Sequence, residues 1–288
     1  MLFVQHLLNG LLAGAYYLLI ALGLSLIFSL GGIVNLAHGA FYAIGAYLAV
    51  SIGRTLGFTG AVLLSPIAVG MLGVAIERLL FRRFYKADPA LSLLLTFGLA
   101  MVAEQALRWI FGASPIPFSI PPALKGQILV GDFIYSKYRL LMLAVAVLVV
   151  AGLWFLLRRT PYGRVVRAGV QNPDMVAALG ISLAPYMASV VALAVALAAL
   201  AGVLLAPISG VHPAMGADIL TASFVVVVIG GLGSFWGVVL AAVIVGVVRG
   251  LTVFFFPPAA EASMYVLMLL VLLFRPRGLF GERIQRFE

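Results

Sequence analysis

The segment "LMLAVAVLVVAGLWFLL" (residues 141–157) indicates the kind of fold that this chain adopts. It contains no charged residue, and its polar and apolar residues do not alternate. An apolar run of about 20 residues is long enough to cross a bilayer as an α-helix, whereas a transmembrane β-strand would alternate in polarity. The segment therefore predicts a membrane-spanning helix.

The composition extends this prediction to the whole chain. Of its 288 residues, 64% are hydrophobic and only 9% are charged, and the mean hydropathy is +1.21. Soluble domains contain about 25% charged residues. We therefore predict an all-α, polytopic transmembrane helix bundle that forms a single membrane domain over residues 1–288. There is no cysteine, which excludes disulfides, thiolate metal sites and cysteine nucleophiles. The first 30 residues lack a basic start and a clear cleavage site, so we expect a permanent first span.

The net charge of +9 follows the ends of the apolar runs. Basic residues gather in three clusters, each next to such an end: Arg78, Arg82, Arg83 and Lys86; Arg158, Arg159, Arg164 and Arg167; Arg275, Arg277, Arg283 and Arg286. Basic residues beside membrane spans mark the cytoplasmic side. The charge therefore predicts membrane topology, and nucleic acid is not expected as a partner.

The apolar runs define the expected spans. They cover residues 7–29, 33–52, 58–80, 91–112, 139–157, 184–207, 218–232, 236–255 and 262–274. If every run crosses, the count is nine, with the N-terminus outside and the C-terminus cytoplasmic. Because run 218–232 is short and run 262–274 is marginal, eight crossings remain open. With the Arg78–Lys86 cluster inside, run 91–112 leads outward, so segment 113–138 is expected to be external. Its "SPIPFSIPP" indicates a loop, because proline cannot continue a helix.

Polar residues interrupt the segment "GGIVNLAHGAFYAIGAY" (residues 31–47). Asn35, His38 and Tyr42 are spaced i, i+3 and i+7, so they would share one face of a helix. Polar groups within a span usually face the bundle interior or an aqueous cavity. These residues could line a substrate pathway. Alternatively, Asn35 satisfies the backbone at a helix break near Gly31 and Gly32, while His38 packs against a neighbouring helix.

An acidic residue occurs inside another predicted span, "TFGLAMVAEQALRWIFG" (residues 96–112). Glu104 could carry a proton, or it could form an i, i+4 ion pair with Arg108, and we expect the ion pair. A secondary transporter or channel acting alone would use acidic residues on several spans, so a scarcity of such residues argues against that alternative.

The sequence contains no recognisable set of catalytic residues. His6, His38 and His212 are scattered and form no metal-binding motif. The segment "IGGLGSFWG" (residues 229–237) is not a G-x-G-x-x-G motif, because position 236 is tryptophan, and there is no Walker A sequence. We therefore expect neither a catalytic role nor a cofactor bound by this chain.

The longest predicted cytoplasmic loop covers residues 158–183. After a basic turn, "NPDMVAALGI" indicates a short helix, with Asn172 as N-cap, Pro173 at its first position, Asp174 at the positive end of the dipole and Gly180 at its end. Such a helix could dock into a partner protein or lie on the membrane surface. The residues alone leave both alternatives open.

Five motifs give the chain a family resemblance. They occur in this order: "GIVNLAHGAFYAIGAY" (32–47), "TPYGRVVRAGVQNPDMVAALGI" (160–181), "AGVLLAPISGVHPAMG" (201–216), "VVIGGLGSFWG" (227–237) and "RPRGLFGE" (275–282). Together they resemble the permease subunit of branched-chain amino-acid ABC transporters, specifically the shorter of the two paired permease types. The resemblance extends from about residue 7 to residue 283.

This resemblance implies a multi-pass subunit of a bacterial inner-membrane importer. The implied partners are a second permease, two ABC ATPase subunits that use the ATP, a periplasmic or lipid-anchored substrate-binding protein, and membrane lipid. Substrate-pathway candidates are Asn35, His38, Tyr42 and Glu104. The segment similar to the ATPase-coupling loop comprises Asp174, Met175, Val176, Ala177, Ala178, Leu179, Gly180 and Ile181. The transported amino acid, and whether the permease core is homodimeric or heterodimeric, stay open.

Overall fold

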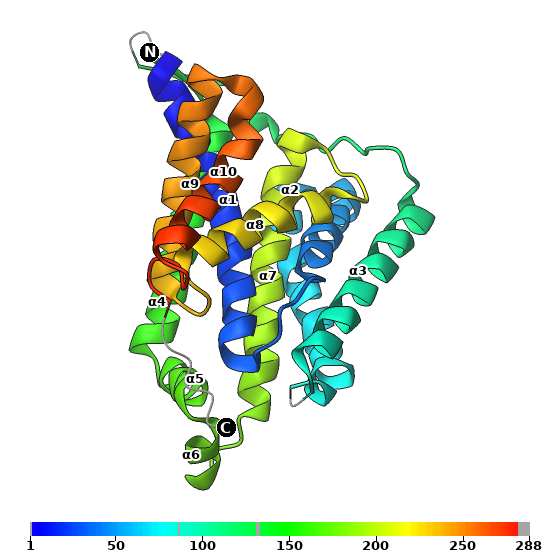
Figure 1. The fold of residues 1–288 in the computed structure, drawn as a ribbon. Helices are drawn as coiled ribbons and strands as arrows, with labels where there is room; N and C mark the ends of the chain where they lie inside the picture. The colour runs from blue at the N-terminus through cyan, green and yellow to red at the C-terminus, as the bar shows by residue number, and fades with distance from the viewer. Residues whose placement is uncertain (1, 86, 131–132, 282–288) are drawn as a thin grey trace.

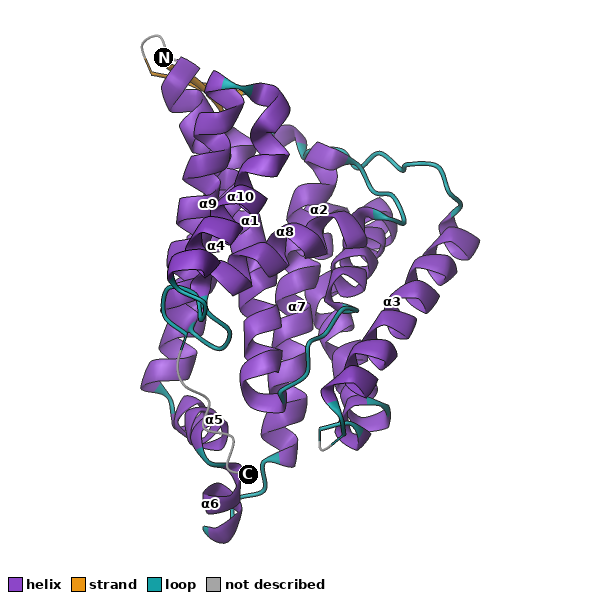
Figure 2. Cartoon of the chain, viewed as in Figure 1, coloured by secondary structure: helices purple, strands orange, loops and turns teal. Residues whose placement is uncertain are grey.

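The computed structural model describes residues 2–85, 87–130 and 133–281, and they form long helices joined by short connections (Figures 1 and 2). The elements are α1 (Leu2–Gly31), α2 (His38–Leu79), η1 (Phe81–Arg83), α3 (Pro89–Phe111), η2 (Pro122–Leu124), β1 (Gln127–Val130), β2 (Phe133–Ser136), α4 (Lys137–Arg159), α5 (Pro161–Gln171), α6 (Pro173–Ala178), α7 (Ala184–Ser209), α8 (Met215–Gly230), α9 (Phe235–Phe255), η3 (Pro257–Ala259) and α10 (Ala260–Phe274). The two strands form a small antiparallel hairpin. The predicted helical membrane protein is confirmed.

Seven helical stretches in the described residues are long and apolar enough to cross a membrane. One of them contains α2, which bends at Gly57 (φ 69°) and therefore has two arms, residues 38–56 and 58–79. Ala49 before the bend and Ala61 after it both pack against Val203, so the second arm returns along α7. With the arms counted separately and the shorter apolar helix α8 included, these helices agree with the predicted eight or nine crossings.

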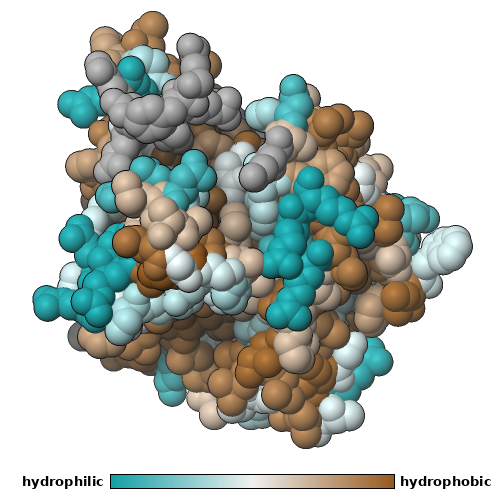
Figure 3. Space-filling view, turned by 90° about the horizontal axis from the view of Figure 1, so that it is seen from below, coloured by the Kyte–Doolittle hydropathy of each residue, from teal (hydrophilic) through white to brown (hydrophobic). Residues whose placement is uncertain are grey.

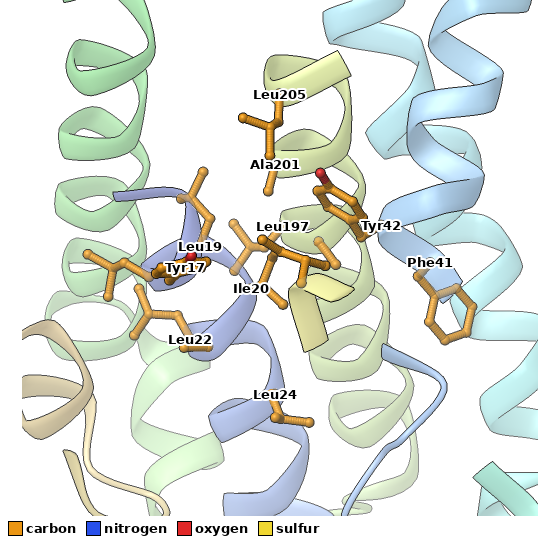
Figure 4. Packing of buried hydrophobic residues seen from close by; sticks show 14 of the residues in the cluster. Tyr17, Leu19, Ile20, Leu22, Leu24, Phe41, Tyr42, Leu197, Ala201 and Leu205 are labelled. Atoms are coloured by element: carbon orange, nitrogen blue, oxygen red, sulfur yellow. The ribbon is translucent and has the colours of Figure 1, made fainter. Parts of the chain in front are cut away.

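The core lies where α1, α2 and α7 meet. Both arms of α2 pack on α7, and α1 contacts α7 on one side and α9 on another. Figure 4 shows how Leu19, Ile20 and Leu197 fill the space between α1 and α7 beside Tyr42 of α2. Small residues permit this close packing, because backbones approach most closely where side chains are short.

The outer helices expose apolar side chains that a soluble protein would bury. Trp109 on α3 is 86% exposed, Leu148 on α4 is 70% exposed and Phe274 at the end of α10 is 80% exposed. Lipid tails solvate such residues as well as a protein core does, so helices in a bilayer need not bury them. The surface of the bundle therefore matches a lipid environment.

The two ends of the bundle differ in structure. One end holds the start of α1 and the β1–β2 hairpin, and the opposite end holds α5 and α6 (Figure 1). Hydrophilic side chains form broad patches on the α5–α6 end, which Figure 3 shows from below. In the predicted basic clusters, Arg158 and Arg159 end α4 next to α5. Lys86, Arg283 and Arg286 lie outside the described residues.

The helix breaks that follow α1 and α7 have the same backbone geometry. After α1, Gly32 has φ 64° and its N–H donates to the Phe28 carbonyl at 2.9 Å; after α7, Gly210 has φ 71° and its N–H donates to the Ala206 carbonyl at 3.0 Å. A positive φ suits glycine because it has no β-carbon. We call residues 32–37 the first break and residues 210–214 the second break.

The helices that follow the two breaks begin in the same way. His38 N donates to the Asn35 carbonyl at 3.2 Å, and Met215 N donates to the His212 carbonyl at the same distance. The sequences around these turns are also alike, with "IVNLAHGA" (33–40) matching "GVHPAMGA" (210–217). Each break is therefore a tight turn that starts a shorter helical arm inside the bundle.

The two breaks have opposite orientations. α1 begins at the hairpin end of the bundle, whereas α7 begins at the α5–α6 end (Figure 1). Leu12 in the first half of α1 and Leu204 near the end of α7 line the same small cavity, while Gly23, further along α1, lies beside Ala194, nearer the start of α7. The helices are thus antiparallel, and the segments form an inverted pair of the kind found in membrane transporters.

Candidate functional site

Asn35 is fully buried in the first break, directly before α2. Its Oδ1 accepts a hydrogen bond from Ala37 N at 3.1 Å, while its Nδ2 is buried without a hydrogen-bond partner among the described residues. An asparagine side chain that accepts from the backbone two residues on is a standard turn device. The expectation that Asn35 shares a helical face with His38 and Tyr42 is therefore wrong, because the helix begins only at His38.

His38 is the first residue of α2 and is fully buried. Its ring lies against Gly23 of α1, where a β-carbon would meet Nε2. The Ile20 carbonyl is the nearby backbone acceptor, but neither ring nitrogen reaches a hydrogen bond of normal geometry within the described residues. His38 thus packs at the α1–α2 contact, as one of the two sequence interpretations expected.

Tyr42 follows His38 by one helical turn and is 1% exposed. Its carbonyl oxygen lies against Gly202 of α7. The small cavity between α1, α4 and α7 and the two open clefts near segment 113–138 are lined by other residues than Asn35, His38 and Tyr42. The three residues lie together in the packed interior, and a role in the substrate pathway stays a prediction that requires the packing to open.

The predicted ion pair on α3 is confirmed. Arg108 donates to Glu104 Oε1 at 2.7 Å across one helical turn. The two side chains are 43% and 28% exposed, respectively, so the pair lies at the edge of the structure rather than in its core. A role for Glu104 in the substrate pathway stays a prediction.

Two charged residues inside the apolar runs, one fully buried and one partly buried, were not among the predicted site residues. Glu77 near the end of α2 is fully buried, and its Oε1 accepts from the Tyr85 hydroxyl at 3.3 Å. Burial and the neighbouring carboxylate raise the pKa of Tyr85 above its usual range. Arg249 of α9 donates to the hydroxyl groups of Tyr16 and Tyr17 of α1. A charge inside an apolar run was the available signal in both cases.

The predicted coupling segment has well-formed caps. Asn172 Oδ1 accepts from Met175 N at 2.9 Å, and Pro173 is the first residue of α6. At the other end Gly180 has φ 79°, and its N–H donates to the Ala177 carbonyl at 2.9 Å. The predicted capped helix is confirmed. The expected basic turn before it is instead an eleven-residue helix, α5, because Thr160 caps Gly163 N and Pro161 opens the helix.

The coupling segment exposes apolar side chains at the end of the bundle opposite the hairpin (Figure 1). Met175 is 58% exposed and Leu179 is 71% exposed, while Val176 is only 4% exposed and packs inward. α5 is held to α7 by the Tyr162 and Ser189 hydroxyl groups, which lie 2.8 Å apart. Burial raises the pKa of Tyr162, an effect that the Ser189 hydrogen bond partly offsets. This arrangement presents α6 away from the bundle.

Comparison with known proteins identifies the family. Residues 6–274 match the family described as the permease component of the branched-chain amino acid transport system. The chain belongs to this family. It therefore is a multi-pass membrane protein of the ABC-transporter permease class, as the ordered motifs predicted.

Several relatives align with nearly the whole chain. The high-affinity branched-chain amino acid transport system permease protein BraD of Pseudomonas aeruginosa is 30% identical over 97% of this chain and 96% of its own length. The permease protein LivH of Escherichia coli is 28% identical with the same coverage. LivM of Salmonella typhimurium is 30% identical, but the match covers 67% of that longer protein. The chain is therefore similar in length to the LivH and BraD type, as predicted.

A solved structure supports the fold. The complex "PsaBC from Streptococcus pneumoniae in complex with Fab" contains a chain that superposes with a TM-score of 0.50 and 14% identity, over 94% of this chain and 90% of that one. At this identity the likeness concerns the arrangement of helices alone.

Proposed function

We propose that this chain is the permease subunit of an ATP-driven importer of branched-chain amino acids. The family match over residues 6–274 carries this proposal, and the relatives BraD and LivH are branched-chain amino acid permease proteins. A second permease would complete the membrane pathway. Two ATPase subunits and an external binding protein would supply the energy and the substrate, and the C-terminus would be cytoplasmic.

The coupling role falls on residues 174–181. The exposed apolar side chains of Met175 and Leu179 lie at the end of the bundle that holds α5 and α6. A short amphipathic helix with one buried anchor, Val176, suits a groove in a partner. Motion of the ATPase subunits would reach the bundle through α6 and α5, because α5 is bonded to α7 through Tyr162. ATP itself would be bound by the partners.

The deciding experiment is reconstitution of this chain with its co-purified partners in liposomes. We expect uptake of radiolabelled leucine, isoleucine or valine that requires internal ATP and the external binding protein. A complex whose ATPase subunits lack the Walker A lysine is the matched control. Uptake by this chain alone, without ATP, would overturn the importer assignment in favour of a secondary transporter.

A further inference from the structure

An open cleft of about 400 Å³ lies at the hairpin end of the bundle. The start of α1, the start of α4, the end of α7 and the hairpin form its walls. Pockets of this size hold small organic molecules, and the lining of this cleft combines several polar residues with a smaller number of apolar ones. The chemistry of the lining decides which molecule fits.

The positive charge of Arg139 dominates the cleft. Its guanidinium donates to Asn9 Oδ1 at 2.6 Å, and Asn9 is neutral. No carboxylate in the described residues lies within 4.0 Å of it. Arg139 also lies in the first turn of α4, where the helix dipole is positive and a cation is unfavourable without an anion nearby. The guanidinium has five donors, so an anion in the cleft would find donors and charge.

Other groups in the lining complement an amino acid. Gln5 donates its Nε2 to the Ile134 carbonyl at 3.0 Å, which leaves its Oε1 as an acceptor in the cleft lining. Ser136 precedes α4 and makes no capping bond with its side chain, so its hydroxyl is a second acceptor. Ile208, 40% exposed, and Pro207 provide an apolar wall on α7.

We propose that this cleft binds one aliphatic α-amino acid on its way into the permease. Arg139 binds the carboxylate, Gln5 and Ser136 accept from the ammonium group, and Ile208 contacts the aliphatic side chain. This inference rests on the proposed function, which it deepens by assigning a site in the permease itself. The cation, the neutral acceptors and the apolar wall match the three parts of such a ligand.

Binding of radiolabelled leucine to the complete complex in nanodiscs, without the binding protein, tests the proposal. We expect saturable binding that Arg139→Gln weakens about tenfold or more, because a charge-assisted contact to a carboxylate is lost. Arg139→Lys should restore part of the affinity because it keeps the charge. Leucinol, which has no carboxylate, should compete poorly, and glycine should compete poorly because it has no side chain.

Two further variants separate binding from folding. Arg54→Gln removes a cation from the neighbouring cleft lined by Arg54 and Lys125 and should leave leucine binding unchanged. Ile208→Trp leaves Arg139 intact but fills the apolar side of the cleft, and it should also weaken binding. Each variant is compared per folded complex, measured by size-exclusion chromatography.

Three results would overturn the site. They are no saturable leucine binding by the unmodified complex, equal affinity of Arg139→Gln and the unmodified complex, or equal competition by leucinol and leucine. If phosphate-bearing lipid headgroups displaced leucine better than isoleucine does, Arg139 would be a binding site for lipid headgroups and not for an amino acid. ATP-dependent uptake is measured separately, so the proposed function can stand when the site fails.

Discussion

The backbones of Gly39 and Gly216 lie directly against each other where α2 and α8 cross. A β-carbon placed on Gly39 would collide with the Gly216 carbonyl oxygen, and one placed on Gly216 would collide with the Gly39 carbonyl oxygen. Each glycine is the second residue of its helix. The inverted pair of helix breaks therefore meets at a contact that only two glycines can make.

The first prediction concerns this crossing. Gly39→Ala and Gly216→Ala should each destabilise the protein by about 1–3 kcal/mol, because added atoms in a filled contact force the helices apart. Thermal unfolding of the purified complex measures the loss. Gly152→Ala on α4 is the control, because no atom lies within 4 Å of its added β-carbon. Equal melting temperatures for Gly39→Ala and Gly152→Ala would contradict the tight crossing.

The helices were largely predictable from sequence. Every apolar run coincides with a helix or with an arm of α2, because a helix satisfies the backbone polar groups of an apolar segment within the segment itself. The caps of α6 were also predictable, since Asn172, Pro173 and Gly180 act locally. Local chemistry and apolar length together define most of the elements.

The tertiary contacts were not predictable in the same way. The fold places Arg249 of α9 beside Tyr17 of α1, and no local spacing encodes this pair. The crossing of Gly39 with Gly216 joins segments that are far apart in the chain. For Asn35 the sequence left two interpretations open, a helical face shared with His38 or a side chain that satisfies the backbone at a helix break, and the structure agrees with the break. Such outcomes depend on packing between distant segments.

The second prediction concerns Asn35. Asn35→Leu should impair uptake and lower stability by about 1–2 kcal/mol, because Ala37 N loses its buried acceptor. Val34→Leu is the neighbouring control, since the Val34 carbonyl that accepts from Thr96 Oγ1 at 3.2 Å is kept. Uptake rates and melting temperatures are measured for both variants. Full activity of Asn35→Leu would show that the turn at the first break does not need the side chain.

The third prediction concerns topology. The chain has no cysteine, so a single introduced cysteine reports its own position. Lys125→Cys should react with an impermeant thiol reagent added outside intact cells, because segment 113–138 is predicted to be external. Leu179→Cys should react only after the membrane is opened, as a cytoplasmic position would. The reverse pattern of labelling would invert the assigned orientation.

The fourth prediction concerns the coupling segment. Asp174→Lys removes the acidic residue from the first turn of α6, and Gly180→Pro prevents the positive φ of its last turn. Both variants should abolish ATP-dependent uptake while leaving membrane insertion intact. Uptake and insertion are measured together, with Gly98→Ala on the open face of α3 as the control. Normal uptake in both coupling variants would remove residues 174–181 from the mechanism.

The fifth prediction concerns Arg249, the partly buried cation of α9. Arg249 donates to Tyr17 and to Tyr16, its guanidinium carbon lies 5.6 Å from the Tyr17 ring centre, and no carboxylate in the described residues lies within 4.0 Å. Arg249→Leu and Tyr17→Phe should each lower the melting temperature, because each removes one side of the same contact between α1 and α9. Arg249→Lys should lower it less, since the charge is kept.

A double-mutant cycle makes this prediction quantitative. If Arg249 and Tyr17 stabilise the α1–α9 contact together, Arg249→Leu combined with Tyr17→Phe should cost less than the sum of the single changes by about 0.5–3 kcal/mol. Val248→Leu changes the residue directly before Arg249 and is the control. It should show no coupling to Tyr17→Phe. Strict additivity of Arg249→Leu and Tyr17→Phe would mean that the contact contributes nothing to the stability of the bundle, and the arginine would then need another reason to lie within a membrane span.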